Sequence, residues 1–359
     1  MHDPVVSVRR VPVWVQAGLL AAVYFAAAKL SLLLAIPPGY ATAVWPPSGI
    51  ALAATLALGN RVWPGVWVGA ALVNLTVESS WLASALIGTG NTLEALAGAT
   101  LIRRFIGVPY RFERGEDVVK FIALSALSAT VAATIGVMPL VFGHTLSSSQ
   151  ILANWWTWWQ GDASGIAVVA PLVLSWSARD TDASPPSRKL EAAFFALLLL
   201  AVMAAVFGYA NQTAVPYQWP FVILLFTIWA AFRFDQRGVT TTIAAVSAIV
   251  VAFTVQKRGP FALASLGESL LLMLGFISIV VTTGLVLSAA LRERGRVAEE
   301  LRRKRDELES RVRERTLQLE RANRALQEDI AERETAEGRL QESEMRFRLV
   351  IDSVIDYAI

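Results

Sequence analysis

Long apolar runs separated by short polar stretches fill the first 291 residues, and from Arg292 the sequence becomes highly charged. A helix needs about 20 apolar residues to cross a bilayer, and most of the runs approach or exceed that length. The pattern predicts an all-α integral membrane bundle of about 8–10 transmembrane helices, with the shorter runs as candidates for re-entrant segments. The candidate spans are about 12–36, 41–58, 61–77, 84–105, 117–142, 151–177, 190–209, 218–233, 239–255 and 265–291.

Composition supports a membrane protein and excludes several kinds of site. Hydrophobic residues make up 55% of the chain and charged residues 17%, with a mean hydropathy of +0.51. There is no cysteine, and the histidines are His2 and His144, so we expect no metal site, haem or other cofactor. The net charge of +3 is too small to suggest nucleic acid. The first run, 12–36, is long enough to remain as a span rather than to act as a cleaved signal peptide.

The loops between the predicted spans differ strongly in basic residues, which indicates the orientation of the chain. With the N-terminus inside, the outside loops contain only Lys257 and Arg258. Basic residues concentrate in cytoplasmic loops, so residues 1–11 and the segment from 292 are both expected in the cytoplasm. The inside loops contain Arg9, Arg10, Arg61, Arg103, Arg104, Arg111, Arg114, Lys120, Arg179, Arg188, Lys189, Arg233 and Arg237.

Residues 292–343 predict a cytoplasmic coiled coil. One heptad position has Leu301 and Leu308, followed by the less apolar Arg315, Ala322, Asp329 and Ala336. The other position has Val312, Leu319, Leu326, Leu340 and Phe347, interrupted by Arg333. A helix this polar needs a partner to bury such a seam, and membrane insertion gives two copies the same direction, so we expect a parallel homodimer. A single solvated helix is the alternative.

Asp162 lies inside the sixth predicted span, where a carboxylate costs about 2.5–3.5 kcal/mol on insertion scales. Such a residue normally faces the bundle interior. Gly161 and Gly165 give a small-xxx-small spacing for close helix packing, and Asn154 and Trp158 precede Asp162 on the same helical face. This stripe is a candidate for binding a signal.

Glu94 has a similar setting in the fourth span. Gly90 and Gly98 lie four residues to either side, and Asn91 lies three residues before it. Lys29 is the lysine inside the first span, and the predicted depths allow Lys29, Glu94 and Asp162 to meet. Either these three form a structural ion pair, or they form a polar pocket that binds a signal or couples to a partner.

Three further motifs have mainly structural interpretations. Trp155, Trp156, Trp158 and Trp159 are typical of an interfacial aromatic belt, although adjacent rings cannot all face lipid, so we expect Trp158 to turn inward over Asp162. In "VWPPSG" (44–49) the prolines predict a helix start with Ser48 near the cap, or a helix break beside a cavity. In "GNRVWPGVWVG" (59–69), Gly65 and Gly69 form another close-packing pair.

The chain resembles two known families. "WPPSGIALAATLALGNRVWPGVWVGAALVNL" (45–75) and "WWQGDASGIAVVAPLVLSW" (158–176) are similar to the membrane-associated sensor family of the first type. The stretch from Val312 resembles the linker and opening helix of a PAS domain, as found in bacterial sensor histidine kinases and diguanylate cyclases. The resemblance implies a sensory domain at 12–291, a linker at 292–343 and the start of a PAS domain at 344–359, with an output module beyond.

No catalytic residue is predicted within this sequence. Asp162, Ser164 and His144 are the residue types of a hydrolase triad, but His144 falls in an outside loop and no nucleophile-elbow motif surrounds Ser164. The sequence favours the input module of a sensor histidine kinase. The input module of a diguanylate cyclase or phosphodiesterase, and a secondary transporter-like protein, are the alternatives. Its expected partners are a second copy, membrane lipid, and a small-molecule signal or membrane protein.

Overall fold

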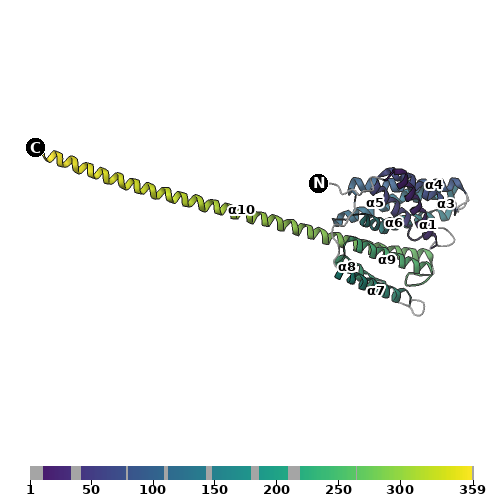
Figure 1. The fold of residues 1–359 in the computed structure, drawn as a ribbon. Coiled ribbons are helices and arrows are strands. Elements are labelled where there is room, and N and C mark those ends of the chain that lie inside the picture. The colour runs from purple at the N-terminus through teal and green to yellow at the C-terminus, as the bar shows by residue number, and fades with distance from the viewer. Residues whose placement is uncertain are drawn as a thin grey trace. The chain divides into compact units, whose positions relative to one another are not determined.

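The computed structural model describes residues 11–33, 42–77, 80–108, 112–142, 148–178, 186–208, 219–263 and 265–357. Within these ranges the chain is helical and contains no strand, which confirms the predicted all-α class (Figure 1). The chain divides into two compact units, residues Met1–Glu293 and Arg294–Ile359. We call them the membrane unit and the linker unit.

The first six helices of the membrane unit form one packed group. They are α1 (Val13–Leu32), α2 (Pro46–Leu58), α3 (Trp63–Leu75), α4 (Trp81–Phe105), α5 (Gly115–Phe142) and α6 (Ser148–Ser177), with the short 3-10 turn η2 (Asn60–Val62) before α3. Helix α4 packs against α3 and α5, and α2 packs between α4 and α6. Small residues predominate where these helices meet, so their backbones approach closely.

The remaining helices of the membrane unit join this group through α9. They are α7 (Pro186–Gly208), the 3-10 turn η4 (Trp219–Val222), α8 (Ile223–Arg233), α9 (Gln236–Val255) and the first part of α10 (Leu266–Tyr357). Helix α9 packs on α6, α7 and α8. A Cβ added to Gly284 of α10 would lie 2.8 Å from the Thr227 side chain and 2.9 Å from that of Ile243, so α10 fits closely against α8 and α9. One apolar core includes residues from both groups of helices.

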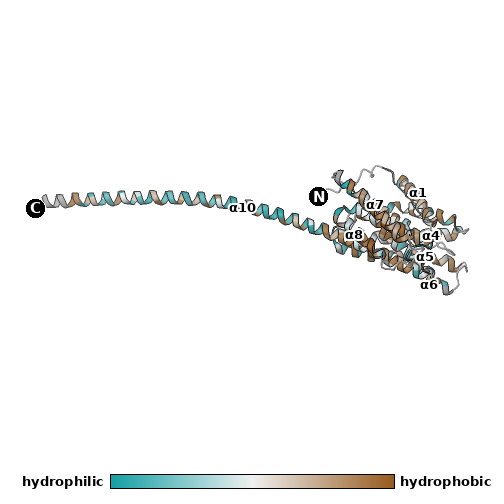
Figure 2. Ribbon diagram, turned by 90° about the horizontal axis from the view of Figure 1, so that it is seen from below, coloured by the Kyte–Doolittle hydropathy of each residue, from teal (hydrophilic) through white to brown (hydrophobic). Residues whose placement is uncertain are grey.

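Five described helices are long and apolar enough to cross a membrane: α1, α5, α7, α9 and the apolar part of α10. The ribbon of the membrane unit is coloured mostly as hydrophobic residues, whereas the linker part of α10 is largely hydrophilic (Figure 2). Helices α2 and α3 contain 13 residues each. At 1.5 Å per residue each is about 20 Å long, shorter than the roughly 30 Å hydrocarbon core. The pair therefore suits a re-entrant hairpin better than two full spans.

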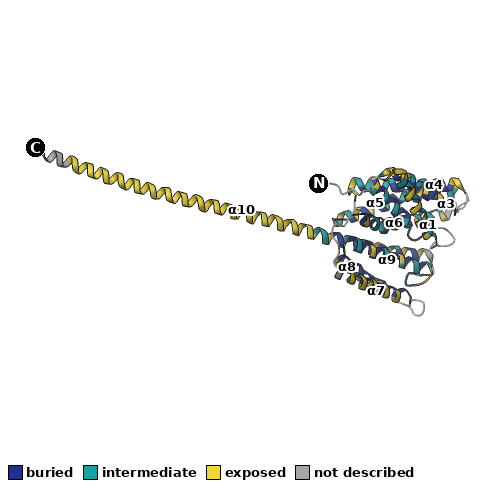
Figure 3. Cartoon of the chain, viewed as in Figure 1, coloured by how far each residue is buried: buried dark blue, intermediate teal, exposed yellow. Residues whose placement is uncertain are grey.

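The linker unit is a charged helix. Every residue from 294 to 351 is exposed (Figure 3). Acidic and basic residues four positions apart pair along its surface, as in Glu299 with Arg303 and Glu307 with Arg311. Such pairs support an isolated helix weakly, by about 0.2–0.5 kcal/mol each. The apolar positions of the predicted seam are exposed along this unit.

Candidate signal-sensing site

The segment before α2 runs directly against α6. The Trp45 backbone N–H donates to the Gly161 carbonyl at 2.8 Å, and the Ser164 hydroxyl donates to the Ala43 carbonyl at 3.0 Å. Pro46 and Pro47 occupy the first helical turn of α2, where the missing N–H groups cost no helical hydrogen bond. Thus α2 starts in contact with the middle of α6.

Glycines make this contact possible. A Cβ added to Gly161 would lie 2.7 Å from the Thr42 carbonyl oxygen, and one added to Gly165 would collide with the Trp45 carbonyl. A Cβ on Gly49 of α2 would collide with the Gly165 carbonyl and lie 2.7 Å from the Val169 side chain. Backbone blocks each of these positions, so no side-chain rotation would relieve the clash.

Ser48 of α2 bridges the two intramembrane carboxyls. Its hydroxyl lies 2.6 Å from Asp162 Oδ1 of α6 and 3.2 Å from Glu94 Oε2 of α4. The exposed fractions of Ser48, Glu94 and Asp162 are 3%, 2% and 1%. We call these three residues the carboxyl cluster. The predicted helix start is confirmed, because Trp45 is the N-cap residue of α2 and Ser48 lies near it in the first turn, with its hydroxyl pointing to the carboxyls.

Tyr24 of α1 adds a fourth polar group. Its side chain is completely buried, faces the Trp45 side chain, and interacts electrostatically with both Asp162 and Glu94. The Tyr24 hydroxyl has no hydrogen bond of ordinary geometry within the described residues. Glu94 Oε1 and Asp162 Oδ2 are likewise buried without a hydrogen-bond partner there. Buried polar atoms are nearly always satisfied in native proteins, so these atoms make the cluster a candidate binding site.

Lys29 does not join the carboxyl cluster. Its ammonium lies 5.8 Å from the centre of the Phe25 ring on the same helix. Within the described residues it forms no ion pair with Glu94 or Asp162. The predicted three-residue grouping is therefore replaced by one in which Ser48 and Tyr24 accompany the two carboxyls. The direction of the first span predicts how deep Lys29 lies in the membrane. It does not predict which side of the helix faces the carboxyls.

The other polar residues of the predicted stripe also lie apart from the cluster. The Trp158 ring packs on Gly136 of α5, where an added Cβ would lie 2.6 Å from a ring carbon. The Asn154 amide donates back to the Gln150 carbonyl at 2.9 Å. The buried Asn91 amide donates to the Ile87 carbonyl of its own helix. No hydrogen bond between these three side chains and the carboxyl cluster occurs in the described part of the chain.

Most of the tryptophan group turns toward α5 rather than toward lipid. The Trp155 indole donates to Thr134 Oγ1 at 3.1 Å, and the Trp159 indole donates to the Ala126 carbonyl at 2.8 Å. Trp156 stacks on Trp159 and is 42% exposed. Trp156 therefore fits the predicted interfacial position best, and the other rings contribute to packing between α5 and α6.

The remaining predicted packing glycines lie at close helix contacts. Added Cβ atoms at Gly69, Gly90 and Gly98 would lie 2.9 Å from α1, 3.1 Å from Ile135 of α5 and 3.0 Å from Ser128 of α5. At Gly65 the added atom would collide with the Ala17 carbonyl of α1. These contacts hold α1, α3, α4 and α5 in place around the carboxyl cluster.

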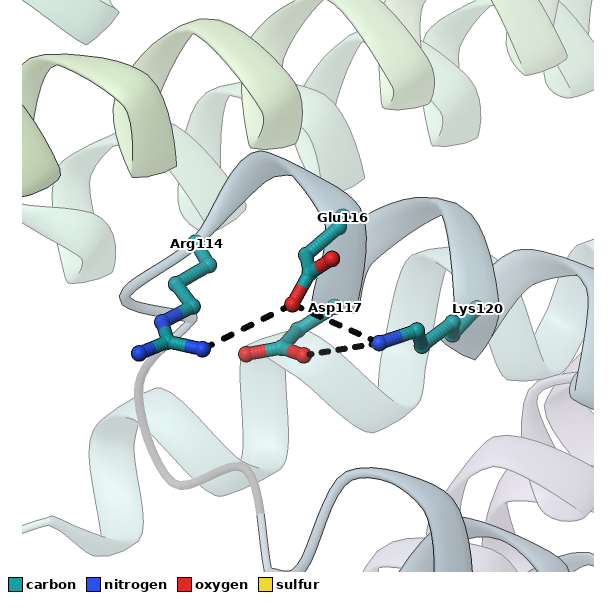
Figure 4. Close-up of polar contacts among 4 residues, drawn as sticks. All are labelled: Arg114, Glu116, Asp117 and Lys120. Atoms are coloured by element: carbon teal, nitrogen blue, oxygen red, sulfur yellow. Dashed lines mark ion pairs between the residues drawn. The ribbon is translucent and has the colours of Figure 1, made fainter.

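A separate charged group lies at the start of α5. Glu116 pairs with Arg114 at 3.6 Å and with Lys120 at 3.4 Å, and Lys120 also lies 4.0 Å from Asp117 (Figure 4). The Glu116 side chain is 58% exposed. Exposed pairs of this kind contribute little to stability. Glu116 is therefore a suitable exposed control for acid-to-amide substitutions in the membrane unit.

A polar junction fastens the last span to its neighbours. Gln236 lies buried at the start of α9. Its side-chain oxygen Oε1 accepts from the Arg292 guanidinium of α10 at 2.6 Å and from the Phe112 backbone N–H at 3.0 Å. Arg292 also donates to Ser288 at 2.8 Å. We call Gln236, Arg292 and Phe112 the α9 junction. This junction could not be predicted from the sequence, because a lone glutamine after an aspartate cap resembles an ordinary helix start.

Helix α6 is joined to α9 next to this junction. Ser175 and Thr240 share a hydrogen bond of 2.9 Å, and the Trp176 indole donates to Thr241 Oγ1 at 3.1 Å. Arg237 donates to the Ser175 and Ala178 carbonyls at the end of α6. Helix α6, which contains Asp162, is therefore hydrogen bonded to α9, and Gln236 of α9 binds Arg292 of α10.

This helical bundle, with buried carboxyls and a final apolar helix that continues into a charged one, has the form of a membrane sensor. The MASE1 family model matches residues 16–295, and the chain belongs to this family. MASE1 is a membrane-associated sensor domain, a sensory input domain found in signalling proteins such as histidine kinases and diguanylate cyclases. No curated protein and no solved structure matches the chain.

Proposed function

We propose that this chain is the input module of a sensor histidine kinase, in which α10 transmits a signal from the membrane unit to a dimeric linker. The observation that carries the proposal is α10 itself. It is one helix from Leu266 to Tyr357, with buried residues such as Met273 and Val280 in its apolar part and an exposed apolar seam beyond Arg294. We therefore propose that a change in the packing of α10 reaches the linker along this helix.

The carboxyl cluster is the sensing end in this proposal. It joins α2, α4 and α6 through buried polar atoms, where a change in charge or hydrogen bonding alters helix packing. A signal needs only to favour one arrangement over another, and a coupling of about 1–3 kcal/mol is typical.

The α9 junction is the connection to α10. A shift of α6 would move α9 through Ser175, Thr240 and Arg237, and α9 would move α10 through Gln236. This route consists of direct hydrogen bonds between helices. Its role in coupling is a proposal that mutation can test.

A second copy of the chain is the proposed partner of the linker seam. Leu301, Leu308, Val312, Leu319 and Leu326 are each 60–69% exposed, at the spacing of a coiled coil. Two copies inserted in the same membrane have parallel linkers, so each seam meets its equivalent. Residues 344–359 would then open a PAS domain, and the sequence beyond Ile359 would distinguish a kinase from a diguanylate cyclase output.

The positive-inside distribution supports cytoplasmic ends for the chain. A reporter enzyme that is active only in the cytoplasm should be active when it is fused after Leu301. Activity of a periplasmic reporter at this position would overturn the proposed topology.

Substitution of Asp162 tests the sensing role. Asp162→Asn nearly preserves shape and removes the charge, so in the full-length parent it should insert and dimerise while the response to stimulus is lost. Glu116→Gln, an acid-to-amide change in the exposed group at the start of α5, should respond normally. If Asp162→Asn lowers expression or melting temperature and the surviving protein signals normally, Asp162 is structural and the sensing role is wrong.

A further inference from the structure

The carboxyl cluster has too few hydrogen-bond donors for two carboxylates. Glu94 and Asp162 meet at one hydroxyl, and a serine hydroxyl has a single hydrogen. That hydrogen can be shared between two carboxylates only as a weaker three-centre bond. Both contacts are full hydrogen bonds if the other carboxyl brings a hydrogen of its own.

We propose that the cluster is a proton-binding site that holds one proton between Glu94 and Asp162. This inference deepens the proposed function by naming the proton as the ligand, and its signalling role rests on that function. The two distances indicate where the proton lies. The 2.6 Å contact between Ser48 and Asp162 has the length of a hydroxyl donating to a charged carboxylate, whereas the 3.2 Å contact with Glu94 is longer than a charge-assisted bond.

The hydrogen-bond order is therefore Glu94 O–H to Ser48 Oγ, and Ser48 O–H to the Asp162 carboxylate. One negative charge remains in place of two. Burial of two uncompensated charges is strongly unfavourable, and among the described residues no ion pair links either carboxyl to a basic side chain: Lys29 lies over Phe25, and Arg103 binds the Thr55 carbonyl. One proton removes most of that cost. The Ser48 hydroxyl then accepts one hydrogen bond and donates another.

Tyr24 is an independent indication of a ligand site. Its fully buried hydroxyl lies beside the Trp45 side chain, interacts with both carboxyls, and forms no hydrogen bond to either carboxyl in the described part of the chain. It can donate to a carboxylate when the charge in the cluster increases.

The charged groups described on the surrounding helices have partners elsewhere. Arg103 of α4 donates to Asn60 Oδ1 and the Thr55 carbonyl, and Lys29 of α1 lies over Phe25. Described residues of α2 and α3 include none, and those of α5 are Glu116, Asp117 and Lys120 in its exposed first turns. Arg237 of α9 binds the end of α6. Among the described residues, the titratable groups that interact within the cluster are therefore Glu94, Asp162 and Tyr24.

A metal ion fits the site less well than a proton. No group of three or more histidine, cysteine or acidic side chains that could hold a metal occurs among the described residues. Two carboxyls bridged by a hydroxyl at 2.6 and 3.2 Å are already in hydrogen-bond contact. A sodium ion between them would have to separate these contacts.

Loss of the proton would change the packing of the helices. The O–H bond at Glu94 breaks and the proton passes to water, which leaves two carboxylates at one serine. Their repulsion in a low-dielectric interior would drive α4 and α6 apart. The α9 junction would then pass the movement of α6 to α10.

Infrared difference spectroscopy of the whole chain in lipid nanodiscs tests the site directly, because a protonated buried carboxyl has a distinct C=O stretch. At neutral pH we expect this band in the native chain, its loss in Glu94→Gln, and its retention in Glu116→Gln. Raising the pH should remove the band from the native chain. Ser48→Ala should shift the band, because its hydrogen-bond partner is lost.

Three results would overturn the proton site: no such band at neutral pH, a band unaffected by Glu94→Gln, or loss of the band when sodium chloride replaces choline chloride. The last result would assign the site to a metal cation. The spectrum does not depend on signalling. If the band behaves as expected but Glu94→Gln signals like the native protein at every pH, the proton site stands and the sensing function fails.

Discussion

The membrane unit and the linker unit use polar and apolar residues in opposite ways. In the membrane unit, apolar residues cover the surface and the informative positions are the few buried polar ones, such as Ser48 and Glu94. In the linker unit, charged residues cover the surface and the informative positions are exposed apolar ones, such as Leu319. In each unit, the residues that differ from their surroundings are the best candidates for function.

The two units should also differ in their tolerance of substitution. Contacts in the membrane unit involve backbone packed on backbone, where an added atom has no space. The linker unit has no such contact within one chain, because its residues from 294 to 351 are all exposed. Substitutions in the linker should therefore act through assembly rather than through folding.

The largest expected effect is that of Gly165→Ala. Its Cβ would collide with the Trp45 carbonyl, so the start of α2 must move away from α6. We expect a loss of about 3 kcal/mol of stability or failure to fold, measured by thermal unfolding in detergent. Gly275→Ala is the matched control, because nothing lies within 4 Å of its added Cβ. Equal melting temperatures for the two variants would contradict the close packing of α2 on α6.

A smaller effect is expected for Gln236→Leu. Arg292 and the buried Phe112 N–H lose a shared acceptor, at a cost of about 1–3 kcal/mol for an unsatisfied buried group. The folded variant of the full-length parent should lose its response to stimulus. Gln236→Glu keeps an acceptor and should restore the response, while Gln256→Leu changes an exposed glutamine and should have no effect. A normal response from Gln236→Leu would remove the α9 junction from the signalling route.

Leu319→Asp should act on assembly alone. A charge in the seam weakens dimerisation, while the helix and the membrane unit remain folded. Leu317→Asp makes the same change two residues away, at a position outside the seam, and should leave the dimer intact. Analytical ultracentrifugation in detergent measures the dimer fraction. Equal loss of dimer in both variants would mean that the linker has no specific seam.

The smallest effect is expected for Glu300→Gln. The hydrogen bond from Lys304 holds the pKa of Glu300 below its usual value, so the pair supports the helix when Glu300 is ionised. Because the folded pKa is lowered, this support is present at neutral pH and is lost as the pH falls through the titration of Glu300. Circular dichroism of residues 292–347 as a peptide should show slightly reduced helicity and a weaker decline at acidic pH. A large loss of helicity would mean that the pair is more than a surface contact.

The fold could be predicted largely from hydrophobic runs, because a helix in lipid must satisfy its own backbone and therefore needs a long apolar segment. The helical class, the burial of Asp162 and Glu94, and the close packing at the flanking glycines followed from the same reasoning. The composition of the site could not. Serine and tyrosine are common in spans, so neither Ser48 nor Tyr24 differs from its surroundings in sequence, and their meeting depends on how α1 and α2 turn. Lys29 was conspicuous in sequence, but its helix directs it toward Phe25.

The most direct test of the link between the two units is disulfide crosslinking at Leu308→Cys in native membranes. The chain has no cysteine of its own, so the introduced thiol reports on one seam position. If the carboxyl cluster controls the linker, Asp162→Asn should change the crosslinking rate by about fivefold, the factor that corresponds to a coupling of about 1 kcal/mol, whereas Glu116→Gln should leave it unchanged. Identical rates in the native background, Asp162→Asn and Glu116→Gln would show that the cluster does not act on the linker.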